Sequence, residues 1–201
     1  AYGMAMSRLK KRPVSSRLAS VYISFMRGTP IVLQILIVYS LLPSLLNAFF
    51  QRFAPSVNVF DANPIIYALV VFTLNTIATL SEVFRSALPT VDRGQYEAAL
   101  SAGLTHFQAY TRIIIPQALL SALPNICNLA VSLIKNTSLA FMMTVKDITA
   151  VAKIQASYGF NYIEAYLDIF LIYIIVCSVV QLLFKLAEKK FTKKGVKRVR
   201  N

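Results

Sequence analysis

The sequence predicts an all-α protein that crosses a membrane several times. Hydrophobic residues make up 57% of the 201-residue chain, and its mean hydropathy is +0.61, which is too apolar for a soluble domain of this size. Long stretches carry no charged residue, and they do not alternate between apolar and polar residues as membrane strands do. These observations favour a multi-span bundle of membrane helices.

Four stretches supply the spans. A hydrocarbon core about 30 Å thick takes about 20 helical residues to cross. We expect spans at about 29–50, 64–82, 116–134 and 162–186. Pro30 and Pro64 suit the first turns of their helices, where a missing N–H has little effect. Pro43 is expected to kink the first span, which neighbouring helices tolerate in a membrane.

The connections between the spans differ in character. Residues 85–115 form a long polar loop, in which 95–105 is expected to be a short helix. Residues 138–145 are apolar but too short to cross, so we expect a re-entrant or interfacial element packed against protein. We treat 1–201 as one transmembrane domain. An apolar start at 2–6, ahead of a basic cluster, suggests that a preceding span is missing.

The net charge of +13 follows the membrane ends. Most of the 21 lysine and arginine residues lie before the first span, between the second and third, or after the last. The positive-inside rule therefore puts both termini of the chain and the 85–115 loop in the cytoplasm. A solvated basic tail beside a membrane explains the C-terminal charges, so no nucleic-acid partner is expected.

Two predicted spans carry a polar face at helical spacing. Polar groups at membrane depth avoid lipid, so each face is expected to meet protein or a water-filled cavity. A solute path and hydrogen bonds that hold helices together are both open interpretations. The solute-path candidates are Asn75, Thr79 and Glu82 on one face and Asn125, Asn128 and Ser132 on the other, extended by Ser86 and Lys135. Glu82 and Arg85 are also close enough to pair on one helix.

No catalytic group is apparent. His106 is the only histidine, and nothing in the sequence places a carboxylate beside it. Metalloprotease, nucleophile-elbow and phosphate-loop motifs are absent from the sequence. Cys127 and Cys177 fall in apolar spans without metal-ligand spacing, so we expect neither a metal site nor a disulfide. The chain is therefore not expected to be an enzyme.

The 85–115 loop has features of a docking site. Ala98 and Ala99 are small, so that a partner can approach closely, and Glu97 is expected near a helix start, where a carboxylate favours the dipole. Gly103 permits a sharp turn and a close backbone contact. Residue chemistry alone does not separate a docking site from a well-capped loop without a partner.

Sequence motifs distinguish these two interpretations. The loop resembles the EAA-xxx-G-x9-I-x-LP loop of ABC importer permeases, and three other stretches are similar to motifs of the polar amino-acid branch. The loop residues are Glu97-Ala98-Ala99, Gly103, Ile113 and Ile115-Pro116, with Ile115 in place of the usual Leu. The other stretches are Arg27-Gly28-Thr29-Pro30, Leu74-Asn75 with Ser81-Glu82-Val83-Phe84-Arg85, and Leu133 to Leu139. The resemblance covers about residues 8–190. Asn136 stands where an Asp is common, and family members usually have five spans.

The resemblance implies a type I ABC importer permease of a bacterial cytoplasmic membrane. Its expected partners are two ATPase subunits, a second permease subunit, an extracytoplasmic solute-binding protein and a polar amino acid. The ATPase-coupling residues are expected to be Glu97, Ala98, Ala99, Gly103 and Leu104. ATP and Mg would be bound by the ATPase, so no cofactor is expected in this chain. The alternative function is a non-transporting membrane scaffold or sensor with the same fold.

Overall fold

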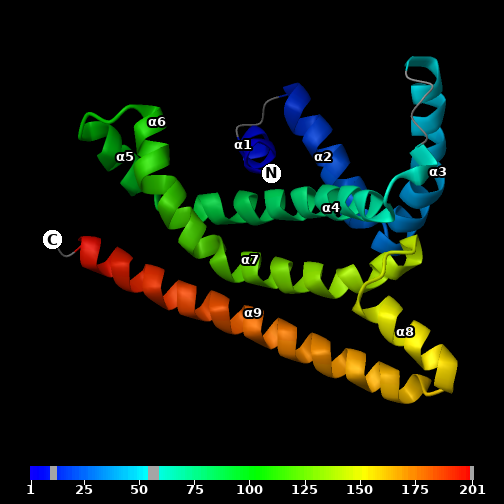
Figure 1. Cartoon of the computed structure of the whole chain (residues 1–201). Helices are drawn as coiled ribbons and strands as arrows, with labels where there is room; N and C mark the ends of the chain where they lie inside the picture. The colour runs from blue at the N-terminus through cyan, green and yellow to red at the C-terminus, as the bar shows by residue number, and fades with distance from the viewer. Residues whose placement is uncertain (10–12, 54–58, 200–201) are drawn as a thin grey trace. The chain divides into compact units, whose positions relative to one another are not determined.

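The computed structural model describes residues 1–9, 13–53 and 59–199, and these are almost entirely helical. In chain order the α-helices are α1 (Tyr2–Leu9), α2 (Pro13–Gly28), α3 (Ile31–Phe53), α4 (Pro64–Ala87), α5 (Arg93–Ser101), α6 (His106–Ala109), α7 (Ile115–Thr137), α8 (Ile148–Gly159) and α9 (Tyr162–Val199) (Figure 1). Short 3-10 turns are η1 (Val59–Asp61), η2 (Leu88–Thr90) and η4 (Ser138–Met143), and η3 (Tyr110–Ile114) is a π-helical turn. No strand occurs in the described ranges, and the all-α prediction is confirmed.

Four helical stretches are long and apolar enough to cross a membrane. They are Ile31–Phe53, Pro64–Thr90, His106–Met143 and Tyr162–Phe191. Each corresponds to one of the four predicted spans. In the last stretch, Tyr162–Phe191, only 6% of the apolar segment is buried by the described chain. Most of its surface is therefore available to lipid or to other subunits.

The described residues form two compact units. The first consists of Ala1–Ile23, Ile77–Val131 and Ser178–Asn201, and the second of Ser24–Thr76 and Ser132–Cys177. Helices α2, α4, α7 and α9 each contribute a segment to both units, because the division falls inside these continuous helices.

The core of the second unit lies between α3, α4 and η4. Its largest fully buried side chains are Ile35 of α3, Val71 of α4 and Met143 of η4, which belong to a single apolar cluster. Ala140 of η4 is buried in the same cluster. The prediction that residues 138–145 pack against protein is therefore confirmed.

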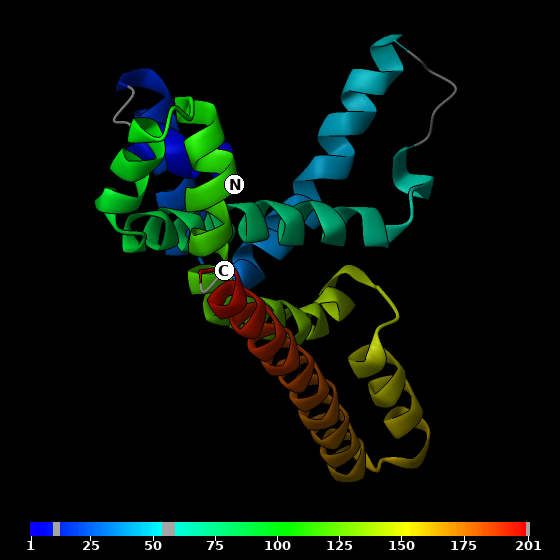
Figure 2. The same ribbon diagram turned by 90° about the vertical axis from the view of Figure 1, so that its left-hand side faces the viewer.

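The core of the first unit lies where the 85–115 loop joins the spans. Leu88, Ile114 and Ala118 form a buried cluster, and Met6 of α1 and Tyr96 of α5 pack against it. Both ribbon views show α5 and α6 folded close together next to the start of α7 (Figures 1 and 2). The polar loop is thus an ordered part of this unit.

Candidate functional site

Helix α5, at the centre of the 85–115 loop, has a well-defined start. The Asp92 carboxylate caps it by accepting a hydrogen bond from the Gly94 backbone N–H at 2.8 Å. Glu97 therefore lies in the second turn, and its predicted place at the helix start was wrong. The physical reason is that Asp92 is the better cap, since its short side chain reaches the free N–H groups of the first turn.

Gly103 ends α5, so the helix stops at Ser101 and is shorter than the predicted 95–105. The Leu104 N–H bonds to the Ala99 carbonyl at 3.1 Å, and the Gly103 N–H bonds to the Leu100 carbonyl at 2.9 Å. These two bonds make a Schellman cap, which needs a residue with positive φ. Gly103 supplies it with φ of +83°. A Cβ at this glycine would meet nothing within 4 Å, so backbone conformation, and not crowding inside the chain, requires glycine here.

The predicted coupling residues divide between two faces of this segment. Glu97, Ala98 and Gly103 are exposed, Leu104 is half-buried, and Ala99 is 3% exposed. The structure therefore brings a carboxylate, a small side chain and a glycine backbone to the surface of one short segment. Ala99 has a different position, since its side chain is buried.

A second helical turn, α6, is tied to α5 by aromatic side chains. The Tyr96 hydroxyl and His106 Nδ1 are 2.7 Å apart, and the Tyr96 ring also meets the edge of Tyr110 at 5.4 Å. Thr105 and Gln108 form a capping box at the start of α6. His106 is exposed, and its hydrogen bond to Tyr96 positions the loop without providing the carboxylate partner that a catalytic histidine uses.

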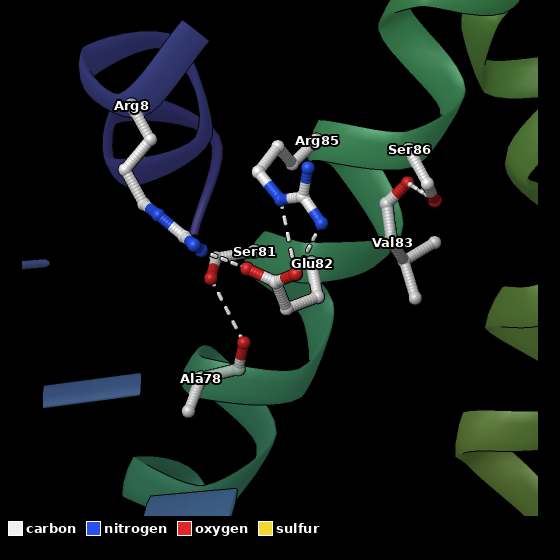
Figure 3. Close-up of polar contacts among 7 residues, drawn as sticks. All are labelled: Arg8, Ala78, Ser81, Glu82, Val83, Arg85 and Ser86. Carbon is white, nitrogen blue, oxygen red and sulfur yellow. Dashed lines mark hydrogen bonds and ion pairs between the residues drawn. The ribbon is translucent and has the colours of Figure 1, made fainter. Parts of the chain in front are cut away.

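Glu82 of α4 lies in an ion cluster with two arginines (Figure 3). Its Oε2 accepts bonds from Nε and Nη2 of Arg85 at 3.0 and 2.8 Å, which confirms the pairing that the sequence spacing allows. Its Oε1 accepts a bond from Nη1 of Arg8, which lies on α1. The Glu82 side chain is only 15% exposed. Sequence reasoning missed Arg8, since nothing local links it to a residue so far along the chain.

Asn75 of α4 takes part in an amide cluster. The Met26 carbonyl has no helical partner, because residue 30 is a proline without an N–H. Gln34 Nε2 donates to this carbonyl at 2.9 Å and Asn75 Nδ2 donates to it at 3.3 Å. Asn75 Nδ2 also lies 3.4 Å from Gln34 Oε1. Sequence reasoning missed Gln34, although the missing N–H of Pro30 is a signal that could have identified the unpaired carbonyl.

The polar face of α7 is arranged differently. Asn125, Asn128 and Ser132 are all exposed. No side-chain hydrogen bond joins any of them to another residue in the part of the chain that the structure describes. On α4, by contrast, Thr79 is half-buried and has a partner within the chain. The six solute-path candidates therefore differ in environment: the three on α7 are exposed, whereas the three on α4 have partners within the chain.

Among the described residues, no three or more histidine, cysteine, aspartate or glutamate side chains form a group that could hold a metal ion. Cys127 of α7 and Cys177 of α9 are free cysteines.

Comparison with known proteins identifies the family. A profile described as "Binding-protein-dependent transport system inner membrane component" matches residues 1–193. The chain belongs to this family. It is an integral membrane permease, and the resemblance to ABC permeases of the amino-acid branch is confirmed over the scaffold alternative.

Similar proteins cover most of this permease. It is 35% identical to the L-cystine transport system permease protein TcyL of Bacillus subtilis, over 94% of this chain and 77% of the relative. It is 40% identical to the probable amino-acid ABC transporter permease protein PatM of Vibrio harveyi, over 85% and 72%. A crystal structure of an amino acid ABC transporter with histidines matches with a TM-score of 0.75 and 29% identity, over 93% of this chain and 81% of the other.

Proposed function

We propose that this permease imports a polar amino acid across a bacterial cytoplasmic membrane, driven by an ATPase that docks on α5. The observation that carries the docking site is the exposed face of Glu97, Ala98 and Gly103, held by a capped helix. Small side chains and a glycine backbone allow a partner to approach closely, while Glu97 offers it a charged hydrogen-bond acceptor. Ala99 is buried behind this face, and the Leu104 N–H bonds the Ala99 carbonyl where the helix ends.

The substrate class is supported by the relatives. TcyL is named for L-cystine, and a nopaline permease of Agrobacterium fabrum is 33% identical to this chain. Both of these compounds carry amino and carboxylate groups, which amide and hydroxyl side chains can recognise by hydrogen bonding. We assign the solute path to the exposed face of Asn125, Asn128 and Ser132. Roles for Asn75, Thr79 and Glu82 in the path stay predictions, since each already has a partner within the chain.

The proposed assembly includes partner subunits, because this chain exposes polar groups at membrane depth that it does not bond itself. An amide-bearing face at membrane depth needs protein or water against it, which a second permease subunit, identical or related, provides. A solute-binding protein delivers the amino acid outside, and two ATPase subunits bind ATP and Mg inside. This orientation puts the C-terminus in the cytoplasm, as the distribution of basic residues favours. Movement of α5 by the ATPase then rocks the spans between outward-open and inward-open states.

Gly103 provides the test, because two substitutions separate docking from backbone strain. Alanine at φ of +83° is strained by about 1 kcal/mol, whereas aspartate tolerates this conformation better. Strain alone therefore makes Gly103→Ala the worse variant. Docking makes Gly103→Asp the worse variant, with ATPase association weakened about tenfold or more, because an unpaired charge in an interface costs about 2 kcal/mol or more.

The measurement is co-purification of the full chain with its ATPase, followed by ATP hydrolysis in lipid nanodiscs across a panel of amino acids with the solute-binding protein. Stimulation by one amino acid, lost in Gly103→Asp and largely kept in Gly103→Ala, supports the proposal and names the substrate. Equal or milder damage from aspartate than from alanine would remove Gly103 from the docking site. Stable association without stimulation by any amino acid would favour a scaffold.

A further inference from the structure

Helix α1 is fastened to two elements that the proposed transport cycle uses. Arg8 reaches Glu82 on α4 (Figure 3). The rings of Tyr2 and Phe84, two residues further along α4, form an edge-on pair with a centroid distance of 6.2 Å. Met6 packs against the buried cluster of Leu88, Ile114 and Ala118. The α1 segment therefore contacts α4 and the two ends of the 85–115 loop at once.

Helix α5, the proposed docking helix, packs against the same apolar cluster. Tyr96 packs against it, and Tyr96 is the residue of α5 that directly precedes Glu97. Met6 and Tyr96 thus rest on one set of buried side chains. Packed side chains resist small relative displacements. A movement of α5 is therefore expected to displace the buried cluster, and with it the α1 helix that packs against the cluster through Met6. The Arg8–Glu82 pair then links α1 to α4.

Glu82 pairs with two arginines, although one would neutralise its charge. Arg85 lies three residues from Glu82 on the same helix and by itself neutralises the carboxylate. Arg8 adds a second positive charge from a residue 74 positions away. The side chains of Arg8 and Glu82 are only 22% and 15% exposed, so the pair is poorly screened by water. Its geometric effect is to join α1 to α4 at a defined point.

We propose that Arg8 and Glu82 are positioning residues for energy coupling: they hold α1 against α4, so that displacement of α5 by the ATPase moves α1 and the C-terminal part of α4 as one body. This inference rests on the proposed function, since it assigns residues to the transmission that begins at the docking site. A merely structural pair, in contrast, would affect folding and leave the transport obtained per ATP unchanged.

The first test is to remove the charge of Glu82 while keeping its shape. In Glu82→Gln and in Arg8→Gln, ATPase association and ATP hydrolysis stay within about twofold of the unaltered complex, while amino acid transported per ATP falls about tenfold, a usual size for a coupling effect. Glu188→Gln is the matched control, because Glu188 is an exposed carboxylate of α9. Its transport per ATP is expected to be unchanged.

A charge-swapped variant checks that the pair itself matters. Arg8→Glu combined with Glu82→Arg keeps one carboxylate and two arginines in the cluster, since Arg85 stays in place. Transport per ATP is expected to return to within about threefold of normal, because the interaction energy of a contacting pair is measured by such a cycle. Failure of the swap to improve on either single variant would overturn the pairing role. Normal transport per ATP in Glu82→Gln would also overturn it.

A distance measurement tests the inference without disturbing the pair. Spin labels at Leu9→Cys on α1 and Thr111→Cys on η3, with Cys127 and Cys177 replaced by serine, report the separation of α1 from the loop. The distance is expected to be the same in nucleotide-free and ATP-bound complexes, and to change with ATP once Glu82→Gln is added. If ATP changes the distance between the labels while Arg8 and Glu82 are both in place, α1 and the loop move separately and the inference is overturned. Lack of ATPase association before any substitution would instead overturn the proposed function.

Discussion

On α4, the polar side chains of Asn75 and Glu82 bond to other parts of the chain, one to a backbone carbonyl of α2 and the other to an arginine of α1. On α7, Asn125 and Asn128 carry equally polar groups at similar helical spacing, yet both are exposed. Helix α4 therefore satisfies its polar groups by packing inside this subunit. Helix α7 leaves them for water, solute or another subunit.

This difference separates two roles that polar residues have in membranes. A polar group that is already bonded inside the subunit contributes to stability, and its loss leaves a partner unsatisfied. A polar group on an otherwise apolar helix that lacks such a bond requires something outside the subunit. The exposed α7 face is therefore the stronger candidate for the solute path, and the α4 face is the stronger candidate for packing.

The largest expected effect comes from removing the α7 face. The triple variant Asn125→Ala, Asn128→Ala and Ser132→Ala should lower apparent amino-acid affinity about a hundredfold, because three lost hydrogen bonds of about 1 kcal/mol each amount to about 3 kcal/mol. The melting temperature should stay unchanged, since these side chains bond nothing among the described residues. Substrate titration of ATP hydrolysis and thermal unfolding in nanodiscs measure the two quantities.

Thr137→Ala is the control for this variant. Thr137 lies on the same helix, and its hydroxyl bonds the Ile134 carbonyl at 2.6 Å, so affinity should not change. A triple variant with normal affinity but weakened association between permease subunits would assign the α7 face to the subunit interface and not to the path.

A smaller effect, on stability, is expected at Gln34. Gln34→Leu removes the donor that bonds the Met26 carbonyl and the Thr29 hydroxyl, at 2.9 and 2.7 Å. Gln34 is 7% exposed, so the loss should destabilise the protein by about 2 kcal/mol. Adding Pro30→Ala should recover part of this loss, because an N–H at position 30 offers the Met26 carbonyl a helical partner. Denaturant unfolding of the detergent-solubilised chain gives both values.

Gln155→Leu is the control, because Gln155 is exposed on α8 and should tolerate the change. Equal stability of Gln34→Leu and Gln155→Leu would contradict the capping role of Gln34. A double variant no more stable than Gln34→Leu would show that the Met26 carbonyl is not the group left unsatisfied.

The smallest effect is expected at Asn75. Asn75→Ala leaves the Gln34 bond to Met26 in place, so it should destabilise the protein by only about 0.6 kcal/mol, an average value for interhelical hydrogen bonds in membranes. Asn75→Asp should be at least as destabilising, because both bonds are donated by Nδ2. Affinity should change less than twofold. Titration showing a tenfold loss of affinity in folded Asn75→Ala would instead place Asn75 in the solute path.

Local sequence patterns were sufficient for features whose cause is local. Charge-free stretches of membrane length predicted the four spans, since a bilayer accepts only segments whose backbone is bonded internally. The three-residue spacing of Glu82 and Arg85 predicted their ion pair. The helix in the 85–115 loop was predicted, but its start was not, because Asp92 and Glu97 both offer a carboxylate and only the backbone geometry selects Asp92 as the cap.

The sequence by itself determined that this protein is an all-α membrane permease of the ABC importer kind, because apolar length, charge distribution and the Glu97 to Gly103 motif are all properties of short segments. Only the tertiary structure decided which polar groups are satisfied within the chain. Arg8 meets Glu82, and Gln34 meets the carbonyl that Pro30 leaves unpaired. The α7 amides meet no such partner among the described residues. Such pairings depend on how helices pack. Helical periodicity predicts the face of the helix on which a side chain lies, but it does not predict which residue of another helix faces it.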